Sequence, residues 1–177
     1  ALVLSPTGGW VTLKDSNGAD FVHQYAPAGQ PPPPPRQHRD ILSRMRRLGT
    51  LVIDYAGGLA PPGPSLRGTF GDVDRLVVAC SGDPGQVADT SAELTWLDQH
   101  GHARLVSEAV LVLSDLTGTA AAQSGLTEAE SQLGTRVRTV VRIPHDPALR
   151  DGGLVDFSAL APLTQEAFRT AGRALFR

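Results

Sequence analysis

Lysine and cysteine each occur only once in this chain of 177 residues, as Lys14 and Cys80. A single cysteine excludes an internal disulfide and any metal site built from several cysteines. No apolar run approaches the ~20 residues that a membrane span needs, and no leader sequence is recognisable. The formal net charge of -2 gives no strong signal for nucleic-acid binding. We therefore expect a cytoplasmic protein without a transmembrane segment, in which Cys80 is a small buried residue.

A run of prolines divides the N-terminal part of the chain. Pro31–Pro35 is an unbroken run, which forms neither a helix nor a sheet ladder and is typical of an extended spacer. Before it, Trp10–Leu13 and Ala19–Val22 flank a turn and predict a short hairpin. After it, residues 36–48 have the spacing of an amphipathic helix. The arginines of this helix form either a solvated face or a surface for a partner or a phosphate.

The rest of the chain alternates short apolar runs with segments of helical spacing. Strands are predicted at four of these runs: Leu51–Asp54, Leu76–Cys80, Ala109–Leu113 and Val137–Ile143. Helices are predicted from the Asp83 cap to Gly101, from the Thr127 capping box to Gly134, and from about Thr164 onward. Such alternation, with right-handed crossovers, predicts an α/β fold with a mainly parallel sheet and helices on both faces. We expect this domain over residues 36–177, after an irregular segment over residues 1–35.

Polar and turn-forming residues follow each predicted strand, and ligands of parallel sheets bind beyond these carboxyl ends. The four ends read Asp54-Tyr55-Ala56-Gly57-Gly58, Ser81-Gly82-Asp83-Pro84, Ser114-Asp115 and Pro144-His145-Asp146-Pro147. Asp54 stands where nucleotide hydrolases hold the acidic residue that organises magnesium, but an aspartate that caps the following loop fits equally well. The other ends offer groups that could line a nucleotide or another small ligand, although capping explains Asp83 and turn formation explains Asp115.

Several of these motifs occur in the order and spacing of one known family. They are Leu51–Asp54 with Gly57-Gly58-Leu59, Asp74–Val78 leading to Asp89–Ala92, Leu94–Gly101, Val110–Leu113, Val140–Pro147, and Asp156–Leu163 before a final helix. On these residues, the chain from about residue 50 to residue 177 resembles the C-terminal half of the MinD/ParA-type ATPases. More specifically, it is similar to the MinD-like proteins associated with actinobacterial type VII (ESX) secretion.

The resemblance implies a P-loop fold with ATP and magnesium as cofactors. It implies that Asp54 binds the metal and that Gly57 and Gly58 belong to the switch segment of the family. It also implies that two strand ends enclose the adenine base, with the residues Ser114, Asp115, Pro144, His145 and Asp146.

The phosphate-binding loop of that family has no counterpart in this sequence. Such a loop, G-x-x-x-x-G-K-[ST], needs a lysine directly after a glycine, because the ammonium must reach the β- and γ-phosphates. Lys14 follows Leu13, and a variant loop with a second lysine is impossible in a chain that has only one. We therefore expect weak or no ATP binding, and no efficient ATP hydrolysis by this chain alone.

The resemblance and the missing loop together predict an accessory or regulatory protein of type VII secretion that acts through protein contacts. Its expected partners are secretion components or a second copy of the chain, because four parallel strands leave an open sheet edge. Two alternatives stay open. One is a fragment of an active MinD/ParA-type ATPase whose N-terminal half is missing, and the other is a scaffold whose proline run recruits a groove-bearing partner.

Overall fold

The computed structural model describes residues 2–4, 10–14, 20–24, 43, 51–53, 70–149 and 155–176. The chain divides into two compact units, Ala1–Asp72 and Val73–Arg177. The sequence instead suggests a boundary at the proline run. This run and the predicted helix over residues 36–48 lie outside the described residues, apart from Ser43.

The first unit contains two pairs of strands. Strand β2 (Trp10–Lys14) pairs antiparallel with β3 (Asp20–Gln24), so the pairing predicted for these two segments is confirmed. Strand β1 (Leu2–Leu4) pairs in parallel with β4 (Leu51–Ile53). The unit ends with the 3-10 turn η1 (Phe70–Asp72).

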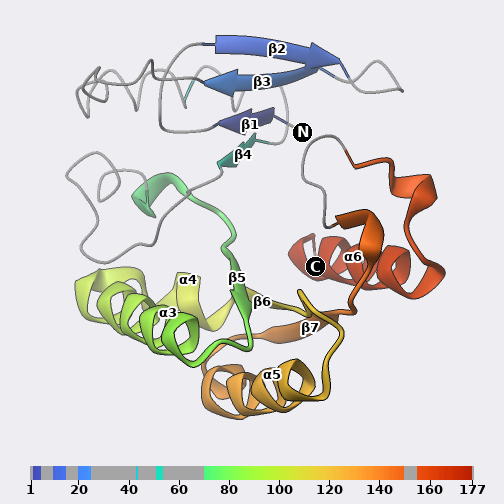
Figure 1. Cartoon of the computed structure of the whole chain (residues 1–177). Helices are drawn as coiled ribbons and strands as arrows, with labels where there is room; N and C mark the ends of the chain where they lie inside the picture. Colours follow the sequence, from blue (N-terminus) through green and yellow to red (C-terminus); the bar gives the residue numbers. More distant parts are fainter. Residues whose placement is uncertain are drawn as a thin grey trace, which may run out of the picture. The chain divides into compact units, whose positions relative to one another are not determined.

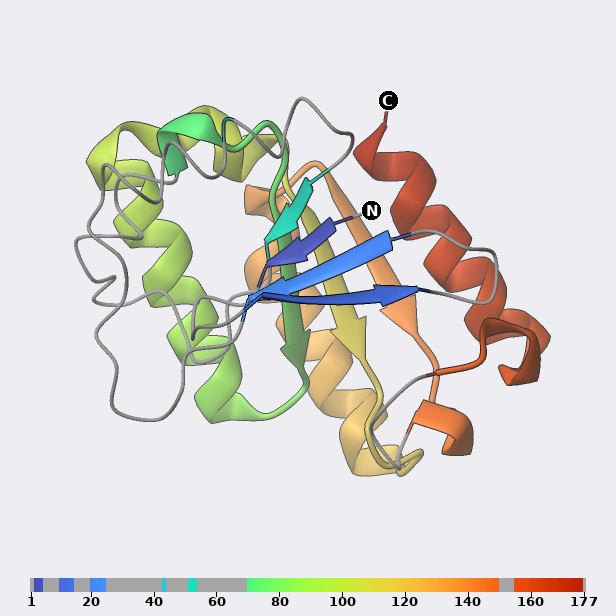
Figure 2. The same ribbon diagram turned by 90° about the horizontal axis from the view of Figure 1, so that it is seen from above.

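The second unit is built on a parallel sheet of three strands, β5 (Val77–Ser81), β6 (Val110–Ser114) and β7 (Thr139–Ile143), in that order. Figure 2 shows the three arrows side by side and pointing the same way. The parallel α/β architecture is thus confirmed, and three of the four predicted strands lie in this sheet. The fourth predicted strand, at Leu51, pairs with β1 in the first unit, which the local apolar pattern could not reveal.

Four α-helices and several shorter turns complete the second unit. They are α3 (Pro84–Leu97), the π-helical segment η2 (Asp98–His102), α4 (Ala103–Ser107), α5 (Ala120–Leu133), η3 (Gly134–Arg136), η4 (Pro147–Leu149), η5 (Phe157–Ala159) and α6 (Pro162–Leu175). Helices α3 and α5 lie on one side of the sheet and α6 lies on the other (Figure 1).

The alternation of side chains along the strands explains this layering. Val110, Val112, Val141 and Ile143 share one face, where Ala171 of α6 packs against them. Residues at the alternate positions of β6, Leu111 and Leu113, point to the other face and are fully buried. Cys80 is buried on β5, as predicted, and this burial raises the pKa of its thiol.

The start of α3 follows from local chemistry, whereas the start of α5 differs from the prediction. Asp83 caps α3 by accepting a hydrogen bond from the amide of Gln86 at 3.1 Å, as the sequence predicts. The capping box predicted at Thr127 is wrong as a helix start, because α5 begins earlier, with Thr119 accepting from the amide of Ala122. Thr127 instead lies inside the helix, where its hydroxyl donates to the carbonyl of Gln123.

The predicted start of α6 and the predicted end of α3 are close to the observed ones. Helix α6 begins at Pro162, two residues before the predicted Thr164, because proline suits the first helical position. The regular part of α3 ends at Leu97 rather than at Gly101, and the chain continues through η2. Gly101 has a φ of +88° there, a left-handed conformation that glycine adopts without strain.

Candidate functional site

A cavity of about 220 Å³ lies at the carboxyl ends of β6 and β7, where the sequence predicts a ligand site. We name it the strand-end cavity, and it is lined by Ser114, Asp115, Leu116, Ile143, His145, Asp146, Leu149 and Phe168. The structure thus brings together four predicted site residues from two strand ends: Ser114, Asp115, His145 and Asp146. Pro144 lies between two of the lining residues. The predicted magnesium ligand Asp54 and the glycines Gly57 and Gly58 lie outside the described residues.

The carboxylate of Asp115 shapes the turn that leads from β6 into α5. Its Oδ1 accepts hydrogen bonds from the amides of Thr117 at 3.1 Å and Gly118 at 2.7 Å, and its Oδ2 accepts one from the Gln123 side chain. Burial alone raises the pKa of Asp115, but these donors and the nearby His145 outweigh it, so that the pKa lies below its ordinary value. Asp115 is therefore ionised at neutral pH and already engaged by its own loop.

Asp146 connects the end of β7 to the start of α6. Its Oδ2 accepts a hydrogen bond from the amide of Ala161 at 2.8 Å, and its Oδ1 accepts one from the amide of Ala148 at 3.0 Å. These two amides, ahead of the nearby His145, hold the pKa of Asp146 below its ordinary value. Only 6% of Asp146 is exposed, so its two oxygens serve the fold rather than a ligand.

His145 lies close to both carboxylates and to the turn after β6. A Cβ atom added to Gly118 would lie 3.0 Å from Nδ1 of His145, so the backbone of this turn passes directly against the imidazole. No hydrogen bond joins the His145 ring to either Asp115 or Asp146 within the described part of the chain. The described residues of the cavity therefore form no hydrogen-bonded histidine–carboxylate pair.

One side of the strand-end cavity is apolar. Leu116 is 63% exposed and Phe168 of α6 is 38% exposed, and Leu149 lies partly buried beside them. Sequence reasoning missed these residues as part of a site, because an apolar residue in a loop or on a helix face fits the core equally well. The position of Leu116, directly after the predicted site residues Ser114 and Asp115, was the one available signal.

The end of β5 does not contribute to the cavity. Ser81 accepts a hydrogen bond from the amide of Asp83, and Asp83 in turn caps α3. The next residue, Gly82, packs against the backbone of α5: an added Cβ would lie 2.6 Å from the amide nitrogen of Leu126 and 2.7 Å from the carbonyl carbon of Gly125. The space beyond this strand end is therefore filled by α5, and capping accounts for Asp83.

The only lysine of the chain ends a strand of the antiparallel hairpin. Lys14 is the last residue of β2. The lysine of a phosphate-binding loop lies instead between a strand and the helix that follows it, where backbone amides surround the phosphates. Among residues 70–149 and 155–176, and the shorter described segments, no group of three or more potential ligands could hold a metal ion.

Two comparisons with known proteins give no relative for this chain. No model of a known protein family matches it, and no curated protein does. The resemblance to MinD-like proteins therefore rests on the motifs themselves. In the described residues, no helix has both the length and the apolar character that crossing a bilayer requires.

Proposed function

We propose that this chain is a MinD-like accessory or regulatory protein of type VII secretion, with a P-loop-like fold, that acts in the cytoplasm through contacts with other proteins. In this proposal it binds ATP weakly or not at all. The observation that supports it best is the place of Lys14, the only lysine of the chain, which ends a strand of the hairpin instead of lying between a strand and a following helix. In addition, Asp115 and Asp146 are nearly buried and accept hydrogen bonds from their own chain.

The electrostatics of the strand-end cavity also argue against phosphates bound within it. Two ionised carboxylates line it, and His145 is the only one of its described lining residues that can carry a positive charge. A site that binds the β- and γ-phosphates needs lysine, arginine or a row of backbone amides aimed at them. Its volume of about 220 Å³ is also below the ~300–1,000 Å³ of typical small-molecule pockets.

The apolar rim of the cavity supports a role in protein contacts. Leu116 and Phe168 lie at its mouth, and Phe157 packs edge-on against Phe168 with ring centroids 6.5 Å apart. Phe157 is itself 42% exposed. Neighbouring exposed apolar side chains of this kind are typical of surfaces that bind another protein.

Equilibrium binding of magnesium-ATP to the purified chain tests the nucleotide half of the proposal. We expect no saturable binding and no phosphate release above background. Asp54→Asn is the informative variant, and Asp89→Asn, which replaces an exposed aspartate of α3, is its matched control. Tight, saturable binding, with hydrolysis that Asp54→Asn abolishes and Asp89→Asn preserves, would show instead that the chain carries an active nucleotide site.

Light scattering coupled to size-exclusion chromatography tests the other part of the proposal, that the chain binds other proteins. We expect an assembly with a second copy or with added secretion components, which Leu116→Glu weakens. Phe176→Glu is the control, because Phe176 is similarly exposed, at 76%, but follows the opposite end of α6. A monodisperse monomer that binds no secretion component would contradict the proposal.

A further inference from the structure

A second hollow, of about 340 Å³, lies at the opposite end of β7 from the strand-end cavity. We name it the amino-end hollow, and it is lined by Arg138, Thr139, Thr170, Arg173 and Ala174. Thr139 begins β7 and Arg138 directly precedes it, and the other residues come from the last turns of α6. Every polar side chain among the described lining residues is an arginine or a threonine, so these residues offer hydrogen-bond donors from two elements and include no acidic group.

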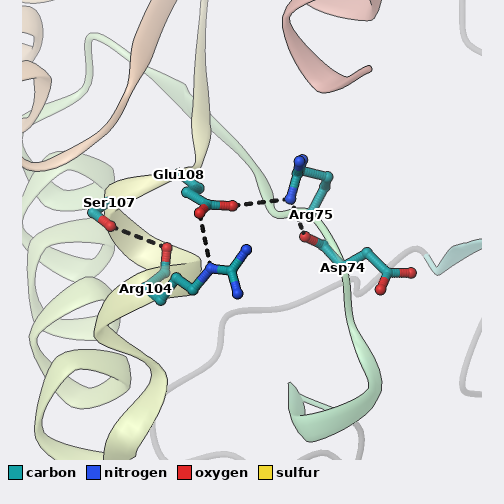
Figure 3. Close-up of polar contacts among 5 residues, drawn as sticks. All are labelled: Asp74, Arg75, Arg104, Ser107 and Glu108. Atoms are coloured by element: carbon teal, nitrogen blue, oxygen red, sulfur yellow. Dashed lines mark hydrogen bonds and ion pairs between the residues drawn. The ribbon is translucent and has the colours of Figure 1, made fainter. Parts of the chain in front are cut away.

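The guanidinium of Arg138 forms no hydrogen bond and no direct ion pair with any described residue, while its backbone amide donates to the carbonyl of Ala109. The acid it influences is Glu108. That carboxylate is already held by two other arginines, by Arg75 at 2.9 Å and by Arg104 at 2.8 Å, and Figure 3 shows it between them.

This arrangement leaves positive charge in excess at the start of β7. The hydrogen bond from Arg104, and then the charges of Arg104, Arg75 and Arg138, hold the pKa of Glu108 below its ordinary value. Glu108 is thus fully ionised at neutral pH, but one negative charge faces three positive ones. No described residue accepts a hydrogen bond from the Arg138 side chain, so its donors can serve another acceptor.

Among the described residues, the second arginine of the hollow is held through only one of its nitrogen atoms. Nη1 of Arg173 contacts Glu166 at 2.8 Å, and the Arg173 side chain is 58% exposed. Such an exposed ion pair contributes little in water and is readily exchanged. Glu166 also contacts Arg169, at 3.7 Å, so its charge is shared between two arginines. Arg173 therefore has donors available to a ligand in the hollow.

We propose that the amino-end hollow binds a phosphoryl group, either as inorganic phosphate or as the phosphate of a small monoester. Two guanidinium forks and two hydroxyls can serve the several oxygens of a phosphate dianion together, whereas a carboxylate has only two oxygens to offer. The C-terminal end of α6, close by, carries a partial negative charge that opposes an anion. Binding therefore depends on Arg138 and Arg173. This site is separate from the strand-end cavity, and it does not require the proposed function.

Titration of the full chain with inorganic phosphate tests the proposal, with ionic strength held constant by sodium chloride. Calorimetry gives the affinity, and the backbone amide signals of Thr139 and Thr170 locate the site. We expect saturable binding with a Kd below about 10 mM. Ribose 5-phosphate is the second probe. If ribose 5-phosphate binds more tightly than inorganic phosphate, the ligand is a monoester. If the two affinities are equal, the site recognises the phosphoryl group alone. Both results support the site.

Variants of three charged residues separate a built site from diffuse surface charge. Arg138→Gln and Arg173→Gln should each weaken binding about tenfold, the effect of one charged hydrogen bond. Arg104→Gln is the matched control, since Arg104 lies beside Glu108 but not in the hollow, and it should leave the affinity within about twofold. Glu166→Gln should tighten binding, because it frees Arg173.

Three results would overturn the proposal. They are no saturable binding of either probe, an equal loss for Arg104→Gln and Arg138→Gln, and a weaker affinity in Glu166→Gln than in the parent chain. The last result is informative because damage to the fold would lower the affinity of every variant. The proposed geometry instead requires the affinity of Glu166→Gln to rise.

Discussion

Replacing Gly125 by alanine tests how the second unit is packed. Gly125 lies in α5, directly against the loop that follows β5, and an added Cβ would overlap the backbone oxygen of Gly82. The contact is mutual, because a Cβ on Gly82 would lie 2.6 Å from the amide nitrogen of Leu126. In both cases the obstructing atoms belong to the backbone, which cannot rotate away as a flexible side chain can.

Two opposing effects set the size of the expected change. Alanine is favoured over glycine inside a helix by about 1 kcal/mol. Overpacking of a filled site costs about 1–3 kcal/mol, and we take the upper end because backbone must move. Gly125→Ala should therefore lower the free energy of unfolding by about 2 kcal/mol. For a unit of this size, that change corresponds to a fall in Tm of roughly 8 °C.

Thermal and urea unfolding, followed by circular dichroism at the helix signal, measure this change. Gly172→Ala is the matched control, because Gly172 also lies inside a helix, α6, but has no atom within 4 Å of an added Cβ. Without an obstruction, only the helix preference remains, so Gly172→Ala should raise the stability by up to about 1 kcal/mol. A Gly125→Ala protein that is as stable as Gly172→Ala would refute the close packing of α5 on the β5 loop.

Three further predictions concern other parts of the chain. The pKa of Asp146 is lower in the folded than in the unfolded protein, so its stabilising effect is present at neutral pH and is lost as the pH falls below about 4. The Tm of Asp146→Asn should thus be lower than that of the parent at pH 7, and it should depend less on pH between about 5 and 2. An equal dependence of the two Tm values on pH would contradict this. Gly118→Ala should lower the free energy of unfolding in urea by about 1–2 kcal/mol, since Gly118 has a φ of +70° and an added Cβ would lie 3.0 Å from Nδ1 of His145; unchanged stability would contradict it. Deletion of Pro31–Pro35 should leave the Tm nearly unchanged, as for a spacer, and a large fall would show that the run packs on the fold.

The parts of the fold that depend on local chemistry could be predicted from the sequence. The aspartate–proline–glutamine start of α3 needs only neighbouring residues, and the apolar runs of β5, β6 and β7 are typical of strands in a parallel sheet. The start of α5 could not be predicted in this way. Thr119 and Thr127 both offer caps, and the earlier one prevails where an alanine-rich turn follows it.

The position of the strand-end cavity could be predicted from the sequence, but the roles of its residues could not. Its polar residues come directly after strands, which is why Ser114, Asp115, His145 and Asp146 were found. The role of Asp146 depends on its bond to Ala161, whose position relative to β7 is set by tertiary structure. The amino-end hollow depends likewise on the packing of α6 against β7, which brings Arg138 and Arg173 together from separate elements.

The double hydrogen bond of Asp146 has a consequence for engineering this protein. One carboxylate fixes the amides of both Ala148 and Ala161, so the chain is fastened on either side of residues 150–154. The entropy cost of a longer loop between fixed ends grows slowly, by about 0.6 kcal/mol for each doubling of its length. An affinity tag or fluorescent domain inserted at residues 150–154 should therefore leave the first turn of α6 in register. Such an insertion would leave every described lining residue of the strand-end cavity unaltered.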